Sequence, residues 1–590
     1  MTTGYNDTFE STVIAALEFE QKLDFLTKGL RFKALGTFKN WSKSINKYSA
    51  GWNKYLLGSY EQNEDGSYSY TTNRVGNEVS TDLNSTNETA GDRRIYLEAM
   101  VDYNRTFGRH DVNAMLLYNQ DELVNNVPGN NLINSLPKRK QGLAGRLSYA
   151  YDGKYMAEVN MGYNGSENFA KGHRWGFFPS IALGYNISEE SFFEPLRKVI
   201  TSMKLRGSWG LVGNDQIGGE RFIYMPTINL SGKGFTTGID QNYGLSGPVY
   251  TRYENNSITW EVGEKINLGI DLQLLNSLNI VVDIFRETRR DIFQKKGTIP
   301  TYLGTGNTDV FGNLAEMKNQ GLDLSIDYNK AFSKDFYMNF KGTFTYAHNE
   351  ITKYDEAPKY AFQSKVGQSA NVSQGYLSNG LFLDEAEIDR YNQQMGSTLG
   401  AGDIKYLNVS NMHGYGDDIV DVDDWTWIGN PTVPEIVYGF GPSFKYKNWD
   451  FSFFFQGVAK TSLFMSGFHP FGDNSLRNVL QFVANDRWSP TNQNVDAKYP
   501  RLTRKTSLNN TNPGNSGRTS DYWMRDGSFL KLKNMELGYT FKRMRFYISG
   551  SNLLTFSKFD LWDPEQGGGS GLKYPTQRVF NVGFQMTFNN

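Results

Sequence analysis

Apolar and polar residues alternate along much of the chain, and this two-residue period is that of a β-strand with one apolar and one wet face. From Lys265 to Leu274 every even-numbered residue is apolar, and the odd-numbered ones are polar or glycine. After a turn at Asn276-Ser277 the pattern resumes as far as Ile284. Further hairpins are predicted from the same pattern at 322–328 with 336–346, around His110, Asp152-Gly153, Lys447-Asn448 and Lys542-Arg543, and in a last strand from Phe580 to Phe588. The chain is therefore predicted to be all-β and antiparallel.

Short links alternate with long polar segments. The short links lie near Lys28, His110, Gly153, Ser277, Lys334, Asn448 and Arg543, with a longer one near Glu194. The long segments lie at about 41–92, 122–140, 165–176, 213–258, 290–317, 351–431, 462–525 and 557–575. Outer-membrane barrels have short periplasmic turns and long extracellular loops. The spacing therefore predicts a transmembrane, up-and-down β-barrel of the outer-membrane type.

The number of strands indicates whether the barrel is complete. The pattern gives about seventeen strands, the first descending from the long-loop side and the last ending on the short-turn side. Closed bacterial barrels have an even number of strands with both ends periplasmic, so we expect strands to be missing at the N-terminus. The segment 41–92 has room for an extra hairpin, which would leave this parity unchanged.

Two local features refine the barrel prediction. Aromatic residues flank the short turns, as an interfacial girdle would, although strands favour Tyr and Phe in general. These residues include Tyr149, Tyr151 and Tyr155, and also Phe444, Tyr446, Trp449 and Phe451. In the strand from Phe529 to Phe541, Lys531 and Lys533 share a face with Met535. We therefore expect the membrane-facing part of that strand to begin near Met535.

Composition excludes several classes of protein. The hydrophobic fraction is 38% and no run of about 20 apolar residues occurs, so spanning helices are not expected. A net charge of -1 argues against a nucleic-acid partner, and the absence of cysteine excludes disulfides and thiolate metal sites. The start, MTTGYNDTFE, is not a signal peptide, so either the protein is cytosolic or its beginning is missing.

Candidate chemistry is sparse. The five histidines (His110, His173, His348, His413 and His469) are scattered, and neither H-E-x-x-H nor G-x-S-x-G occurs. We therefore predict no enzyme activity and no catalytic, cofactor-binding or metal residues, and substrate-binding residues remain unknown. The run Gly567–Gly571 is interpreted as a flexible loop, and the pairs Asp417-Asp418 and Asp423-Asp424 as solvated charge.

Four tryptophans lie in or beside the longest loops: Trp425, Trp427, Trp488 and Trp523. Such rings can stack on sugars or hold a peptide. Anchoring of loops to one another is the favoured interpretation, because large aromatic side chains bury well.

Several ordered stretches resemble the SusC/RagA family of TonB-dependent outer-membrane transporters. They are GRLSYAYDGKYMAEV from Gly145, RWGFFPSIALGYNISEE from Arg174, LRGSWGLVGND from Leu205, NLAEMKNQGLDLSIDY from Asn313, NGLFLDEAEI from Asn379, AGDIKYLNV from Ala401, IGNPTVPEIVYGF from Ile428, YWMRDGSFLKLKNMELGYTF from Tyr522, ISGSNLLTF from Ile548 and YPTQRVFNVGFQMTF from Tyr574. The resemblance covers roughly residues 11 to 588. It implies that residues 1–590 are the C-terminal portion of the barrel, without signal peptide, TonB box or plug, and that about five strands of a 22-stranded barrel are absent.

Two stretches depart from the family pattern. The chain ends Phe588-Asn589-Asn590 rather than on the aromatic residue common at barrel termini. The acidic loop from Asn408 to Trp425, which often looks like a calcium loop in the family, has degraded oxygen spacing, and a solvated loop is the favoured interpretation.

The resemblance implies a TonB-dependent nutrient importer in the bacterial outer membrane. Its expected partners are a SusD-like surface lipoprotein, the TonB complex through a missing N-terminal segment, and outer-membrane lipid. Oligosaccharide is the expected cargo and peptide the second. Two alternatives stay open: a passive or structural barrel such as a porin or adhesin, and a secreted glycan-active enzyme with a soluble β-fold.

Overall fold

The computed structural model of the chain describes residues 4–129, 132–300, 302, 308–391, 399–415, 418–468, 470–471, 478–504, 510 and 519–588. Within these residues seventeen strands belong to one sheet, and five further sheets have two strands each. The predicted strand number is thus confirmed. The chain divides into two compact units: one contains Met1–Tyr149, Val159–Phe178 and Gly219–Phe222, and the other contains Ala150–Glu158, Pro179–Gly218 and Ile223–Asn590.

The first unit is built from long antiparallel strands. β1 pairs with β2, β2 with β5, and β5 with β6. The segment 41–92 does contain an extra hairpin, formed by β3 and β4. It makes a separate small sheet and does not join the large one. The elements from this end of the chain are β1 (Gly4–Lys22), β2 (Leu30–Ser49), β3 (Lys54–Gln62), β4 (Tyr68–Val75), β5 (Asn84–Phe107), β6 (His110–Asn125), α1 (Leu132–Ser135), β7 (Lys138–Tyr151), β8 (Tyr155–Ser166) and β9 (Trp175–Asn186).

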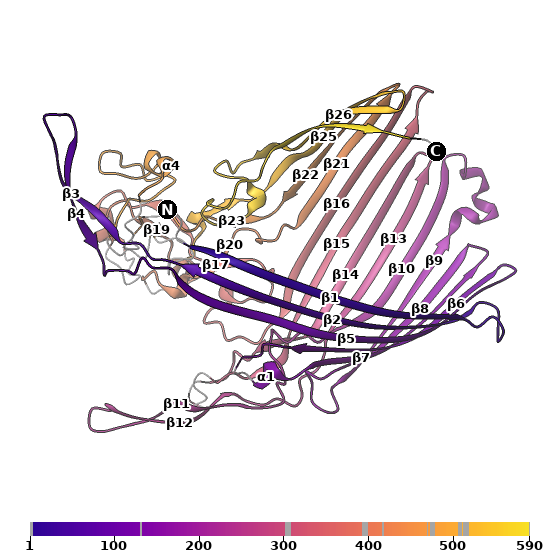
Figure 1. Cartoon of the computed structure of the whole chain (residues 1–590), viewed down its shortest axis with the longest axis horizontal. Helices are drawn as coiled ribbons and strands as arrows, with labels where there is room; N and C mark the ends of the chain where they lie inside the picture. Colours follow the sequence, from indigo (N-terminus) through magenta and orange to yellow (C-terminus); the bar gives the residue numbers. More distant parts are fainter. Residues whose placement is uncertain are drawn as a thin grey trace. The chain divides into compact units, whose positions relative to one another are not determined.

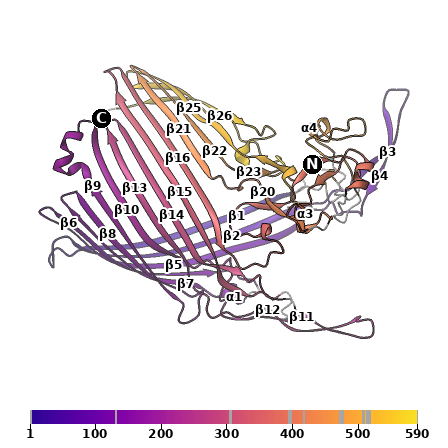
Figure 2. The same cartoon turned by 180° about the vertical axis from the view of Figure 1, so that it is seen from behind.

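The second unit continues the antiparallel pattern from β9 to β27, with each large-sheet strand paired to the next. Figures 1 and 2 show β10 and β13 to β16 side by side from opposite sides. The strands are β10 (Ile200–Asn214), β13 (Glu261–Leu274), β14 (Leu278–Lys295), β15 (Phe311–Ala331), β16 (Phe336–Lys353), β21 (Ile436–Tyr446), β22 (Trp449–Ala459), β25 (Phe529–Phe541), β26 (Met544–Ser557) and β27 (Val579–Met586).

The long segments carry short elements of their own. These are β11 (Thr227–Thr237), β12 (Tyr243–Arg252), β17 (Ser373–Gly375), β18 (Ser378–Leu381), α2 (Glu385–Arg390), β19 (Ile404–Tyr406), α3 (Val409–Met412), β20 (Thr426–Ile428), β23 (Ser462–Phe464), α4 (Gln481–Asn485) and β24 (Met524–Asp526). Among the described residues, none of the helices combines the length and the hydropathy needed to cross a membrane.

The alternation of short turns and long loops is confirmed. β13 and β14 are joined by 275–277, and β21 and β22 by 447–448, whereas 354–435 separates β16 from β21 and 460–528 separates β22 from β25. At the turn between β7 and β8, Asp152 and Gly153 have φ of 55° and 66°. Aspartate and glycine tolerate this left-handed conformation, which is the one that a tight hairpin needs.

The irregular pattern of β25 has a structural cause. The strand begins at Phe529, and its pairing shifts register between Leu532 and Asn534 on both sides. Such a β-bulge adds one residue and exchanges the two faces beyond it. Leu532 and Met535 therefore share a face, opposite Phe455 and Phe453 respectively, and Lys531 lies on the other face.

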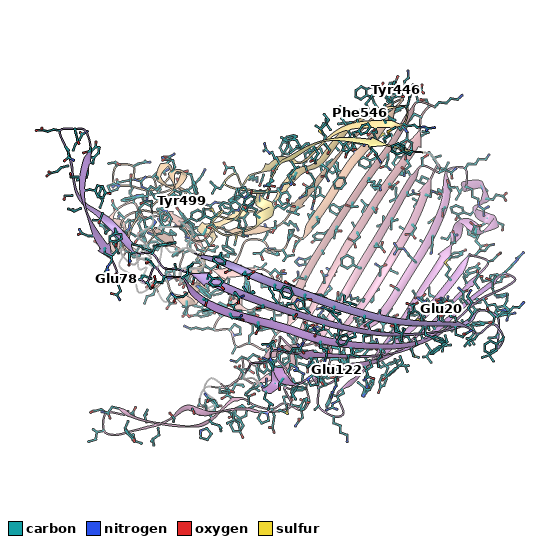
Figure 3. The ribbon with its side chains drawn as sticks, in the orientation of Figure 1. Glu20, Glu78, Glu122, Tyr446, Tyr499 and Phe546 are labelled. Atoms are coloured by element: carbon teal, nitrogen blue, oxygen red, sulfur yellow. The ribbon has the colours of Figure 1, made fainter. Side chains whose placement is uncertain are left out.

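Aromatic side chains gather at the short-turn ends, as expected. Tyr446 and Trp449 are about half exposed beside the turn that joins β21 and β22. The Trp449 ring lies 4.7 Å from that of Tyr539, and Tyr155 stacks on Tyr185 at 5.2 Å. Tyr446 and Phe546 mark this end of the sheet in Figure 3. At the last strand, Phe588 is exposed and lies beyond the end of β27, while 589–590 lie outside the described residues.

Candidate functional site

The two faces of the large sheet differ in chemistry. On β13 and β14 of the second unit, Leu268 and Ile284 are 63% and 59% exposed although they are fully apolar. The opposite face of these strands carries Asp271 and Asp283. Exposed aliphatic side chains on one face and charges on the other are what a wall between lipid and water requires.

Charges on the polar face neutralise one another across strands. Arg206 of β10 donates to Asp271 of β13 at 3.0 Å and to both oxygens of Asp283 of β14 at 2.5 and 2.6 Å. The guanidinium reaches Asp283 over Gly269, where a Cβ atom would lie 2.6 Å from Arg206 Cζ. This glycine leaves the space that the ion pair occupies, so one arginine holds three strands in register.

The same arrangement, an arginine that reaches a carboxylate across a glycine of the middle strand, recurs further along the sheet. Arg545 of β26 donates to Asp450 of β22 across Gly538 of β25, where a Cβ atom would lie 2.6 Å from an Arg545 nitrogen. Arg545 also donates to Glu536 at 2.6 Å. Each of the two triplets places a glycine in the middle strand.

The polar face of the first unit is also lined by ion pairs. Lys33 lies 3.0 Å from Glu18, and Lys43 lies 3.4 Å from Glu10. Arg94 donates to both oxygens of Asp121, across β5 and β6. These groups are partly exposed, so each pair contributes little stability alone. Together they give a hydrated, nearly neutral surface.

The long loops of the second unit have a hydrophobic core of their own. Trp523, Tyr376 and Met465 are fully buried in it, and Trp488 and Tyr499 are nearly so. The cluster draws from the segments 354–435, 460–528 and 558–578. In Figure 3, Tyr499 lies among these loops, away from the turn end marked by Tyr446 and Phe546. Burial raises the pKa of the Tyr499 hydroxyl to about 12.

Asp403 joins two of these loop segments, 354–435 and 460–528. The carboxylate is fully buried and accepts from Arg501 Nη2 at 3.0 Å, Asn510 Nδ2 at 2.6 Å and the Gly400 amide at 2.9 Å. Burial acts to lower the pKa of the Arg501 guanidinium, but its bonds to Asp403 outweigh that effect and raise it. The stretch AGDIKYLNV was noticed in the sequence, but the role of Asp403 was missed, because its side-chain partners, Arg501 and Asn510, lie about a hundred residues away.

A second buried charge anchors the last long loop. Lys531 of β25 is 1% exposed and donates to Asp563 and Glu565, each at 2.6 Å. Lys533 also reaches Glu565, at 2.7 Å. Burial acts to raise the pKa of both carboxyl groups. The hydrogen bond and charge of Lys531 outweigh it together with the Glu565 amide at Asp563 and with Lys533 at Glu565, so the pKa of Asp563 and that of Glu565 lie below their ordinary values.

The tryptophans behave largely as anchors. Trp523 and Trp488 are buried in the loop core, which confirms that interpretation for these two. The Trp427 ring is partly buried, and its indole N–H donates to the Ser364 carbonyl at 2.8 Å. Trp425 is 37% exposed and meets Tyr376 edge-on at 5.9 Å. Of the four, it alone keeps a substantial exposed face.

The interpretation of Asp423-Asp424 as solvated charge is wrong. Asp424 is fully buried and accepts from the amides of Ser410 and Asp421 at 2.9 and 2.8 Å. The bond from the Asp421 amide is part of the capping box of the short 3₁₀ turn Val422–Asp424, and the bond from the Ser410 amide ties that turn to α3. Asp423 receives the ammonium of Lys359. Asp424 thus satisfies a backbone donor that the turn leaves unpaired.

The other acidic and histidine candidates are dispersed. Asp418 accepts from the side-chain Nδ2 of Asn411 at 3.4 Å, whereas Asp417 and His469 lie outside the described residues. His348 lies 2.5 Å from Glu435, and His413 stacks on Phe362. His110 contacts the Tyr149 hydroxyl at 2.8 Å, and the His173 amide donates to the Ala170 carbonyl. In the described part of the chain no three His, Asp or Glu side chains gather in a group suited to a metal ion.

The glycine run is a loop, but it is packed rather than free. The Gly569 amide donates to the Phe464 carbonyl at 2.8 Å, and the Ser466 amide donates to the Gly569 carbonyl at 2.8 Å. A Cβ atom at Gly568 would lie 2.6 Å from the Phe464 carbonyl oxygen. Glycine is needed here because the two backbones touch.

Comparisons with known proteins agree with this architecture. The family described as TonB dependent receptor-like, beta-barrel, matches residues 3–553. TonB-dependent receptor P3 of Formosa agariphila is 25% identical over 99% of this chain and 58% of its own length. TonB-dependent receptor SusC of Bacteroides thetaiotaomicron is 28% identical over 75% of this chain and 43% of its own. The chain spans between 43% and 58% of the length of the four curated relatives that it matches.

Solved structures show the same fold. The structure of the RagAB peptide transporter aligns over 99% of this chain and 63% of its own, with a TM-score of 0.71 and 18% identity. The resemblance to SusC and RagA seen in the sequence is therefore confirmed, and with it the outer-membrane location. The chain belongs to the TonB-dependent receptor-like β-barrel family and is of its SusC/RagA type.

Proposed function

We propose that the chain supplies the wall and the extracellular loops of a TonB-dependent importer that takes up oligosaccharides. Two features that occur together in this chain support the proposal. The sheet has one lipid-compatible face and one charged, hydrated face, and long loops at one end form a packed core.

The proposed partners follow from the same family. A SusD-like surface lipoprotein would cover the loop end, outer-membrane lipid would surround the apolar face, and the TonB complex would supply energy. The relatives are about twice as long as the matched part of this chain in several cases. We propose that the plug, the TonB-contacting segment and the signal peptide precede these residues in the whole protein.

Peptide is the second candidate cargo. The RagAB structure that aligns with this chain is described as a peptide transporter, and that description supports peptide uptake by analogy. A passive or structural barrel is the further alternative, and it differs in one measurable respect, because its transport needs no energy.

Uptake by the native organism tests these alternatives. Cells with and without the gene are supplied with labelled neutral oligosaccharides or labelled peptides, in TonB-competent and TonB-deficient strains. The proposal predicts oligosaccharide uptake that requires both the gene and TonB. Uptake of peptides but not of oligosaccharides would make peptide the cargo. Gene-dependent uptake that persists without TonB would favour the passive barrel.

A further inference from the structure

A cavity of about 340 Å³ opens on the polar face of the first unit, where β2, β5 and β6 approach their long-loop ends. Trp41 is directly opposite Asp92 in the register, and Asp92 is opposite Asn125. Three neighbouring strands thus present an aromatic ring, a carboxylate and an amide at one level. Glu122, labelled in Figure 3, lies on β6 directly before Leu123 of the lining.

The far wall of the cavity is fixed by Arg221. This side chain is 7% exposed and donates to the carbonyls of Ile133, Leu136 and Pro137 at 2.7 to 2.9 Å. It also donates to Glu167 at 2.7 Å. The segment around α1, which contributes Asn134 and Leu136 to the lining, is therefore held in place by a buried cation.

Two buried polar atoms of the lining side chains have no partner among the described residues: Oδ1 of Asp92 and Nε of Arg221. A buried polar atom without a hydrogen bond costs about 1–3 kcal/mol, so native proteins rarely leave one without a reason. The first atom can only accept and the second can only donate. Neither atom is exposed to the cavity, so a hydroxyl group that donates to the one and accepts from the other requires the two side chains to turn toward it.

The other lining residues restrict which chemical class of ligand fits the cavity. The Trp41 indole N–H is committed to Glu10 at 2.9 Å, which holds the ring beside the cavity. An aromatic face next to a carboxylate and amides suits a pyranose, whose C–H face stacks while its hydroxyls bond. The lining carries one carboxylate, Asp92, and two cations, Lys138 and Arg221, and Arg221 is already paired with Glu167, so a strongly charged ligand would find no excess of opposite charge.

We propose that this cavity is a subsite for one pyranose unit of a neutral oligosaccharide, stacked on Trp41 and hydrogen-bonded to Asp92 and Arg221. The inference rests on the proposed import of oligosaccharides and adds the position at which the polar face holds a sugar. Its volume lies at the lower end of the range of about 300–1,000 Å³ for small-molecule pockets, which fits a single ring.

The test uses the full-length transporter, purified in detergent, with Trp41→Leu and Asp92→Asn as variants. Trp209→Leu is the matched control, because the Trp209 indole also donates to a glutamate, Glu264, at 2.8 Å, and it lies outside the cavity. Binding is measured by calorimetry against a panel of malto-, xylo- and laminari-oligosaccharides. Each variant is first checked for wild-type surface abundance and heat-modifiable migration.

The proposal predicts that the tightest-binding panel member loses at least tenfold in affinity in both cavity variants and is unchanged in the control. Wild-type affinity in all three variants overturns the subsite and leaves the proposed function intact, since cellular uptake reports on that separately. Binding of tryptic peptides but of no panel sugar, weakened by the same variants, overturns the sugar assignment. The absence of any panel binding by the wild type overturns it as well.

Discussion

Replacement of Lys531 by methionine should release the last long loop from β25. Lys531 is 1% exposed, and both of its partners, Asp563 and Glu565, are carboxylates at 2.6 Å. Removing one member of a buried ion pair costs about 3–5 kcal/mol. Because the Asp563 and Glu565 side chains are 17% and 34% exposed, solvent screening lowers the expected cost to about 2–3 kcal/mol.

This free energy corresponds to an increase of roughly 30- to 150-fold in local opening. Hydrogen exchange followed by mass spectrometry on the full-length protein in detergent at neutral pH measures it in peptides that cover 558–578. Lys533→Met is the matched control, because Lys533 is 28% exposed and, within the described part of the chain, pairs with Glu565 alone. It should accelerate exchange by no more than about fivefold.

A rescue variant separates charge from packing. With Asp563→Asn and Glu565→Gln added to Lys531→Met, no fully buried charge is left unpaired, because Lys533, which loses Glu565, is 28% exposed. A well-packed neutral site can be as stable as an ion pair. Exchange should then return most of the way to wild type. The reasoning is refuted if Lys531→Met exchanges no faster than Lys533→Met.

Three further outcomes are expected. Trp523→Leu removes much of a fully buried ring and should cost the loop core about 3 kcal/mol, seen as faster protease cleavage within 460–528 while the heat-resistant migration of the barrel is unchanged. Because the pKa of Asp563 and that of Glu565 are depressed, their anchoring is complete above roughly pH 5 and is lost as the pH falls through the folded-state pKa, so exchange in 558–578 should rise only in acid. Gly269→Val should displace Arg206 from Asp283 and lower the thermal unfolding temperature, whereas Gly247→Val, where the Cβ position is open and the backbone is not left-handed, should lower it less.

The strands and the two ends of the sheet were predictable because each rests on a local signal. One face of a membrane strand must be apolar, so the alternation of apolar and polar residues was sufficient to predict β13 and β14. Turn chemistry is local too, as at Asp152-Gly153. Loop lengths then distinguish the two ends without any contact being known.

The bulge in β25 was not predictable from the pattern. One added residue exchanges the faces, so Lys531 appears in the sequence to share the face of Met535, although the two lie on opposite faces. Its burial depends on Asp563, which is 32 residues away. Periodicity carries no information about such a partner.

Buried carboxylates in the loops were also missed or misinterpreted. Asp403 and Asp424 are fully buried, although each stands in a polar stretch that resembles solvated loop. Hydrogen bonds from Arg501, Asn510 and nearby amides satisfy these two carboxylates in the loop interior. The loop core exists because aromatic residues spread over three long segments converge, and only the fold brings them together.

Cysteine labelling on intact cells shows directly which end of the sheet faces the outside, because the chain has no cysteine of its own. Single cysteines are placed at Ser59 and Ser246 in the long segments, and at Asn276 and Lys447 in the short turns, all of them exposed. The account predicts that a membrane-impermeant maleimide labels Ser59→Cys and Ser246→Cys on intact cells, and labels the two turn variants only after the outer membrane is opened. Labelling of the turns but not the loops on intact cells would contradict it.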